Sequence, residues 1–197
     1  MSPEPTRRGL RKEADRRRIY ETALALIEAQ GYEATTLRDI TAGAGVALGT
    51  FFNHFPSKEH LLVDYYLRLQ SDLARHLDPP RRTFRTFLKA FSGLLVAQVK
   101  AHPQVYRAIG AHLLSSGALQ AAEGAACSDM HRRLAAALAR ARDRGEIRAA
   151  ADPEAMASLI LLAHNGAILD TLPDLDGAAF QARLRHYLDP ITALLKP

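Results

Sequence analysis

Residues 36–62 read TLRDITAGAGVALGTFFNHFPSKEHLL, and this stretch decides the fold. Two short apolar stripes flank the small-residue segment Ala-Gly-Ala-Gly-Val at 42–46, and Pro56-Ser57 follows the second stripe. Helices of about seven or eight residues are not stable alone in water, so these two must pack on each other and on a neighbouring helix. Gly45 adopts a positive φ without steric cost, which suits a tight turn. The pattern predicts a helix-turn-helix over about 37–56.

The rest of the chain has helical periodicity, and no segment alternates apolar and polar residues as a strand does. The fold class is therefore predicted to be all-α. A three-helix domain that contains the helix-turn-helix is expected at 12–57, followed at 58–197 by a larger helical domain. The expected helices are about 12–30, 36–44, 48–54, 57–77, 84–102, 104–114, 119–144, 153–171 and 177–195, with Ser57 capping the fourth and Asp78-Pro79-Pro80 ending it.

The chain has 197 residues, a net charge of +5 and a single cysteine, Cys127. One cysteine excludes a disulfide framework and a cysteine-rich zinc site. The polar N-terminal segment lacks the apolar core of a secretion signal, and no run of about 18 apolar residues is present to span a membrane. We therefore expect a soluble cytoplasmic protein.

The N-terminal segment is basic. Residues 6–18 carry seven Arg and Lys residues against only Glu13 and Asp15. A terminal basic arm of this kind commonly contacts nucleic-acid phosphates. A solvated, disordered tail has the same composition and remains the alternative.

The outward face of the third predicted helix carries Ala47, Leu48, Thr50, Asn53 and His54, which are side chains able to enter a major groove. Lys58 follows at the start of the fourth helix, where its ammonium group is expected to join free helix amides in binding a phosphate. The segment therefore indicates DNA binding.

These residues also resemble the DNA-binding domain of the TetR family of bacterial transcriptional regulators, whose signature is roughly T-(L/V)-x-x-I-A-x-x-A-G-V-S-x-G-(T/S)-(L/F)-Y-x-(H/Y)-F-x-(S/N)-K-x-x-L. The matching residues are Thr36, Leu37, Ile40, Ala44, Gly45, Val46, Gly49, Thr50, Phe51, His54, Phe55, Ser57, Lys58 and Leu61. The resemblance implies a homodimeric repressor, or less often an activator, that leaves a double-stranded DNA operator when a small molecule binds. The expected DNA contacts are Thr36, Arg38, Ala47, Leu48, Gly49, Thr50, Phe52, Asn53, His54 and Lys58.

Three DNA-facing positions depart from the family pattern. Ala47 replaces the usual capping serine, Leu48 stands where lysine, arginine or proline is common, and Phe52 replaces a tyrosine that usually reaches a phosphate. Each change removes a polar contact, so a helical ligand-binding or scaffold module without DNA binding remains an alternative. Leu48 and Phe52 either face the groove or pack inward.

The C-terminal segment is expected to hold an apolar or aromatic effector and the dimer interface. The predicted pocket residues are Phe84, Phe87, Phe91, Tyr106, His112, Leu113, His164 and Asn165, with ordinary core packing of the aromatic rings as the alternative. The predicted dimer residues on the last two helices are Met156, Leu159, Ile160, Ala163, Ala167, Phe180, Leu184, Leu188 and Ile191.

The sequence gives little support for an enzymatic function. Gly43, Gly45 and Gly49 have the wrong spacing for a dinucleotide fingerprint and follow a helix. Cys127 and His131 lie four residues apart, but a thiol nucleophile needs an orienting third group, and none is evident. The histidines form no metal-binding pair of helical spacing. We expect no catalytic residue, no metal and no cofactor.

Overall fold

The computed structural model describes residues 6–76 and 83–196. Within these residues the chain forms nine α-helices and one 3-10 helix, with no strand. The predicted all-α class is confirmed.

The N-terminal part comprises α1 (Arg7–Gln30), α2 (Leu37–Ala44) and α3 (Leu48–Phe52). Helix α1 begins five residues earlier than the predicted Lys12, because the Thr6 side chain caps it by accepting a hydrogen bond from the Gly9 amide. The described part of the basic segment is thus helical rather than a free arm. Helix α3 ends at Phe52, so Asn53 and His54 lie in the turn that follows.

The C-terminal part comprises α4 (Glu59–His76), α5 (Phe84–Ala101), α6 (Pro103–His112), α7 (Gly117–Asp143), α8 (Pro153–Thr171), η1 (Leu172–Asp174) and α9 (Gly177–Leu194). Ser57 does not cap α4 as predicted, since its hydroxyl is 2.9 Å from the His60 ring nitrogen Nδ1. The predicted end of this helix at Leu77 and the breaker Asp78-Pro79-Pro80 lie outside the described residues.

Two apolar cores stabilise the chain. The smaller core joins α1, α2, α3 and the start of α4 through Ile19, Ala23, Ile40, Ala44, Phe51, Phe55 and Leu61, all at most 5% exposed. Burial of this many apolar side chains explains how two helices as short as α2 and α3 are held in place.

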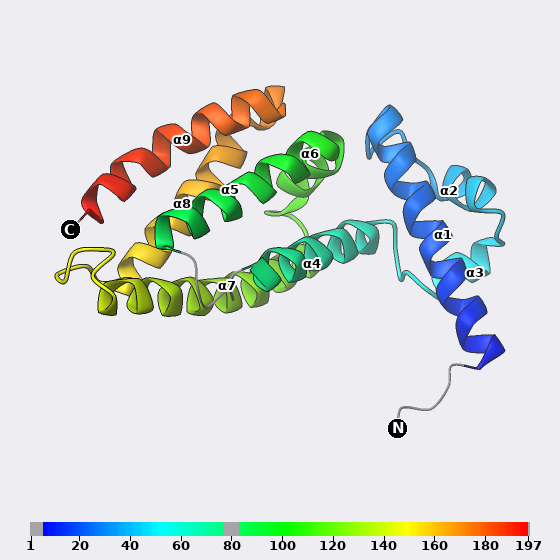
Figure 1. Ribbon diagram of the computed structural model, residues 1–197. Coiled ribbons are helices and arrows are strands. Elements are labelled where there is room, and N and C mark those ends of the chain that lie inside the picture. The colour runs from blue at the N-terminus through cyan, green and yellow to red at the C-terminus, as the bar shows by residue number, and fades with distance from the viewer. Residues whose placement is uncertain (1–5, 77–82, 197) are drawn as a thin grey trace.

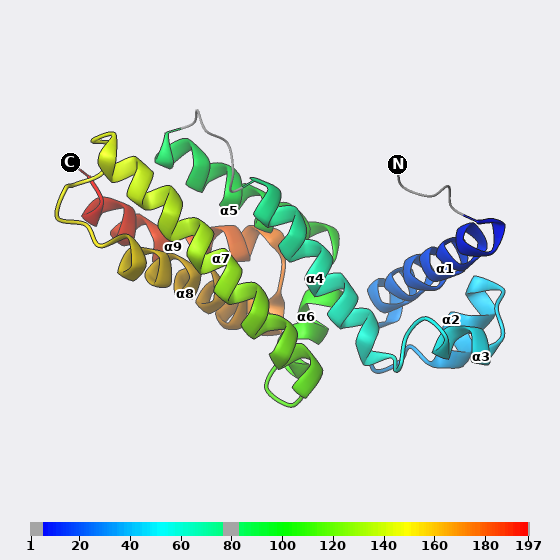
Figure 2. The ribbon, with the colours of Figure 1, turned by 90° about the horizontal axis from the view of Figure 1, so that it is seen from below.

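The larger core lies among α4 to α9, and Ile27 near the end of α1 belongs to it. Figures 1 and 2 show these helices as an elongated bundle with α1, α2 and α3 at one end of it. Helices α1 and α4 therefore pack into both cores, since α4 contributes Leu61 to the smaller core and Leu62 to the larger one. The domain boundary at 57/58 stays a prediction.

Candidate nucleic-acid interface

The turn between α2 and α3 is built from local hydrogen bonds. Thr36 Oγ1 accepts from the Asp39 amide, and the Asp39 carboxylate accepts from the Thr36 amide, which forms a capping box at the start of α2. Hydrogen bonds from the Thr36 hydroxyl and amide lower the pKa of Asp39. Gly45 ends α2 with φ 62° and ψ 40°, as predicted for a left-handed stop.

Helix α3 has one inward and one outward face. Phe51 is fully buried in the smaller core, whereas Leu48 is 50% exposed and Phe52 is 48% exposed. The alternative in which Leu48 and Phe52 pack inward is therefore wrong. Other predicted contact residues are also at the surface, with Thr36, Arg38, Ala47, Gly49 and Asn53 exposed and Thr50 and His54 half-buried.

The start of α3 lacks a side-chain cap. Ala47 occupies the N-cap position and makes no side-chain hydrogen bond there, as its methyl group requires. In the first turn of α3 the Thr50 amide donates to the Ala47 carbonyl at 2.9 Å, and no side chain caps the helix.

Arg16 of the basic segment is not available to DNA in the predicted way. Its guanidinium donates to the His54 carbonyl at 2.9 Å and to the Asp64 carboxylate, and it lies 4.5 Å from the centre of the Phe55 ring. Arg16 therefore ties the end of the α3 turn to α4. Two other cations of α1 have acidic neighbours, since Arg18 pairs with Asp15 at 2.6 Å and Arg17 lies 4.0 Å from Glu21.

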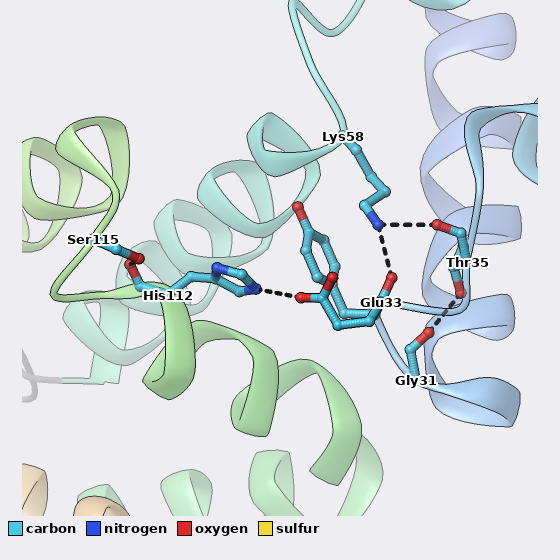
Figure 3. Close-up of polar contacts among 7 residues, drawn as sticks. Gly31, Glu33, Thr35, Lys58, His112 and Ser115 are labelled. Carbon is cyan, nitrogen blue, oxygen red and sulfur yellow. Dashed lines mark hydrogen bonds and ion pairs between the residues drawn. The ribbon is translucent and has the colours of Figure 1, made fainter.

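Lys58 is likewise engaged inside the molecule. Its ammonium nitrogen Nζ donates to the Tyr32 carbonyl at 2.8 Å and to the Thr35 carbonyl at 3.0 Å (Figure 3). The same nitrogen lies 4.0 Å from the centre of the Tyr32 ring. Lys58 was predicted to bind a phosphate, and this prediction is corrected. Its ammonium group instead binds two carbonyl oxygens and lies over the face of a ring.

A polar hollow lies beside α3, between the first turns of α1 and the turn after α3. It is lined by Gly9, Lys12, Glu13, Arg16, Asn53 and His54. The exposed cations Arg7, Arg11 and Lys12 lie on the same end of α1. This end of α1 and the outward face of α3 together form a surface that is polar, basic and partly apolar, which suits a DNA backbone beside a major groove.

The predicted effector residues do not form one pocket. Phe84, Phe87 and Phe91 pack on one another in the larger core, with ring centres 5.7 and 6.2 Å apart along the series. Asn165 is exposed, and half-buried His112 lies beside Tyr32 in the loop after α1. Asn165 and His112 are therefore removed from the predicted set, because helical phase directs them elsewhere. Leu113 is half-buried against the core, and Tyr106 is buried in it.

His164 is buried, and its hydrogen bonds are satisfied within the chain. Its Nδ1 lies 2.7 Å from the Ile160 carbonyl, which only accepts, so Nδ1 carries the proton and Nε2 accepts from the Ser92 hydroxyl at 3.1 Å. Burial lowers the pKa of His164 to about 4. The neutral ring is thus part of the core rather than a free ligand anchor.

The predicted dimer residues divide into two sets. Ile160, Ala163, Ala167, Phe180, Leu184 and Leu188 are buried in the chain's own core, Met156 and Ile191 are half-buried, and Leu159 is 39% exposed. Helix α8 is apolar on several sides. The residues that periodicity predicted for the dimer interface are mostly the ones that face the chain's own core. The outer stripe includes three leucines that were not predicted, with Leu162 65%, Leu169 56% and Leu194 54% exposed.

The Cys127–His131 pairing is also wrong. His131 Nε2 lies 2.9 Å from the Ser158 hydroxyl oxygen and 3.1 Å from the Glu154 carbonyl, so its partners are on α8. Burial raises the pKa of the Cys127 thiol, which opposes thiolate formation. In the described ranges, no three His, Cys, Asp or Glu side chains come together as metal ligands. Nor is any described helix long and apolar enough to cross a membrane.

Residues 19–65, which contain α2, α3 and the packing half of α1, match the family model described as bacterial regulatory proteins, tetR family. This segment is a TetR-family DNA-binding segment. A relative is the transcriptional repressor KstR of Rhodococcus jostii, 32% identical over 109 residues that are 55% of this chain and 51% of KstR. The chain thus matches about half the length of KstR.

Solved TetR-type structures match more of the length. SmeT, the repressor of the Stenotrophomonas maltophilia multidrug efflux pump SmeDEF, is 25% identical with a TM-score of 0.71, covering 91% of this chain and 89% of SmeT. FadR of Bacillus subtilis in complex with stearoyl-CoA has a TM-score of 0.73 at 16% identity, covering 91% and 98%. These relatives are transcriptional regulators, not enzymes.

Proposed function

We propose that this chain is a transcriptional repressor that binds a pseudo-palindromic operator as a homodimer and leaves it when a small molecule binds among α4 to α9. The observation that carries the proposal is the outward face of α3. Leu48, Gly49 and Phe52 are exposed on a helix that the smaller core holds from behind, and Asn53 is exposed in the turn that follows. A face of that kind has no role in the fold, so an external partner accounts for it.

The chemistry of this face favours DNA with apolar groove contacts. The Leu48 methyl groups suit a thymine C5-methyl group, since the major groove presents that group for apolar contact. The exposed cations at the first turns of α1 suit the neighbouring phosphates. We therefore expect a thymine under Leu48 in each half-site.

The outer stripe of α8 and α9 supports a homodimer. We define the α8–α9 apolar face as Leu159, Leu162, Gly166, Leu169, Tyr187, Ile191 and Leu194, which share one side of the two helices. A shallow hollow within it is lined by Leu159, Leu162, Ala163, Gly166, Tyr187 and Ile191. A contiguous exposed apolar patch of this kind is typical of an interface, and two-fold pairing would place two copies of α3 about 34–36 Å apart on DNA.

An apolar effector is consistent with the larger core, which is rich in aromatic side chains. The Tyr106 hydroxyl is buried and has no hydrogen-bond partner among the described residues, so a ligand oxygen next to it would find a donor. The FadR and SmeT neighbours were solved with stearoyl-CoA and with triclosan. Helix α4 joins the N-terminal three helices to the rest of the chain. Effector binding would act on DNA binding through α4, with a coupling free energy of about 1–3 kcal/mol between the two sites.

The test selects operators from a random duplex library and then measures affinity by fluorescence anisotropy. Leu48→Asp should bind the selected duplex about 100-fold more weakly, because a carboxylate among phosphates costs several kcal/mol. Phe52→Tyr, which adds a phosphate donor, should bind about fivefold more tightly. The matched control is Leu114→Asp, a leucine 88% exposed at the turn after α6.

Selection should return two-fold symmetric sites, and the control should bind like the unchanged protein. If no sequence is enriched and low-salt binding to random duplex is also absent, the chain is a helical ligand-binding or scaffold module instead. If Leu48→Asp and Leu114→Asp bind equally, α3 is not the reading element.

A further inference from the structure

Helix α6 is held at both ends by residues from the C-terminal end of α1. At its start, the Glu28 carboxylate accepts from the amides of Gln104 and Val105 at 3.2 and 3.0 Å. At its end, His112 Nε2 lies 2.9 Å from Glu33 Oε1 in the loop that follows α1 (Figure 3). The bundle and the DNA-facing part therefore meet through α6 as well as through α4.

Glu28 takes the role of a missing cap. The first amides of a helix have no partner within it, and a carboxylate there also interacts favourably with the helix dipole. His102, the N-cap residue of α6, makes no side-chain cap bond, and Pro103 has no amide hydrogen. Gln104 and Val105 thus provide the first free donors of α6, and both bind Glu28 of another helix.

The loop at residues 31–35 is contacted from two sides. On the α6 side, the His112 ring packs edge-on against Tyr32, with ring centres 4.9 Å apart. On the α4 side, Lys58 binds the carbonyls of Tyr32 and Thr35 (Figure 3). A displacement of α6 must therefore move this loop relative to the base of α4 or break these contacts.

The other side of α6 is fixed to the corner between α8 and α9. Arg107 Nε donates to the Leu172 carbonyl of η1 at 3.2 Å. Gly110 lies so close to the Leu172 side chain that a Cβ atom at position 110 would be 2.7 Å from Leu172 Cδ1. Helix α6 thus spans from η1, next to the α8–α9 apolar face, to α1.

We propose that α6 is a strut that sets the orientation of α1, α2 and α3 relative to the α8–α9 apolar face, with Glu28 as its positioning residue. The strut keeps the smaller core at one angle to the bundle. Its consequence for DNA rests on the proposed function, because two copies of α3 reach successive grooves only at a fixed separation. The strut itself does not depend on DNA.

The experiment measures the distance between spin labels in the full chain by pulsed electron resonance. Cys127→Ser removes the native thiol, and Ala42→Cys on α2 and Arg132→Cys on α7 provide two exposed sites. Dilution with unlabelled chain removes distances between protomers. Glu28→Ala should broaden and shift the distribution, because the first amides of α6 lose their partner on α1.

The matched control is Glu21→Ala, two turns earlier on α1. This glutamate is exposed, and its ion pair with Arg17 is a long contact of 4.0 Å on the same helix. Its distribution should equal that of the parent. Glu28→Gln, which keeps one acceptor oxygen, should lie between parent and Glu28→Ala. Circular dichroism checks that each variant is folded. If Glu28→Ala is unfolded, Glu28→Gln takes its place in the comparison with the parent.

Hydrogen exchange identifies the contact itself. The Gln104 and Val105 amides should exchange about tenfold faster in Glu28→Ala, because each loses a hydrogen bond to a charged group. If exchange rises while the distance distribution stays that of the parent, Glu28 caps α6 without positioning anything and the proposal fails. An unchanged exchange rate also overturns it.

Binding to the selected operator gives the functional consequence. Glu28→Ala should weaken operator binding about fivefold or more and leave random-duplex binding unchanged, since only the operator requires both recognition helices in register. Equal loss on both duplexes would contradict the strut. The distance measurement uses no DNA, so failure of the strut and failure of the repressor function are distinguishable.

Discussion

His164 is a buried histidine whose neutral form satisfies both ring nitrogens, through the Ile160 carbonyl and the Ser92 hydroxyl. Its pKa is about 4 in the folded chain, below the ordinary 6.5. The neutral ring therefore stabilises the fold fully above about pH 6.5, and this contribution is lost as pH falls toward 4. We expect the titration of His164 to lower the free energy of unfolding by up to about 3 kcal/mol between pH 6.5 and pH 4.

Urea unfolding at several pH values checks this expectation. His164→Gln should flatten the decline in unfolding free energy between pH 6.5 and 4. His186→Gln, which changes an exposed histidine on α9, serves as the control and should keep the parent's slope. A His164→Gln slope equal to the parent's would contradict the assignment.

At the scale of the element, the first turns of α1 separate two kinds of cation. Arg11 and Lys12 are exposed, whereas Arg16 is bound to the His54 carbonyl and Asp64. Replacing both Arg11 and Lys12 with alanine should weaken operator and random duplex about equally and reduce the salt slope by about two per protomer, or about four for the proposed dimer. Anisotropy titrations over a series of salt concentrations measure both quantities.

The control removes the same charge elsewhere, with Arg85→Ala and Lys89→Ala on the exposed side of α5. This pair should leave affinity and slope unchanged. Arg16→Ala should instead lower thermal stability, because the His54 carbonyl loses its donor and Asp64 keeps only Arg68 as a partner. If only operator binding fell in the Arg11 and Lys12 variant, α1 would read bases rather than phosphates.

At the scale of the whole molecule, the α8–α9 apolar face is expected to be covered by a second copy. Leu162→Asp should give a monomer by light scattering at micromolar concentration, since an unpaired carboxylate in an apolar interface costs several kcal/mol. Leu67→Asp changes a leucine 46% exposed on α4 and should remain a dimer. If the unchanged protein is itself a monomer in this measurement, the proposed homodimer is wrong.

Much of the fold follows from local sequence. The helices at 36–44 and 153–171 and the stop at Gly45 were predictable, because helical period, caps and turn residues act over a few positions. The helix-turn-helix follows from the same local rules, whereas the sequence left open whether Leu48 and Phe52 face outward, which their exposure in the structure decides. The start of α1 was missed because the cap is Thr6, outside the apolar stripe.

Helical period, caps and turn residues act over a few positions, so the sequence predicts most of the helices, the turn before α3 and the resemblance to the TetR family. Only the tertiary structure decided which polar groups remain free, because their partners are remote in the chain. Lys58 binds carbonyls 23 and 26 residues earlier, and Glu28 binds amides 76 and 77 residues later. Helix α8 shows the same limit for apolar residues, since a helix that is apolar on several sides does not reveal which stripe faces its own core.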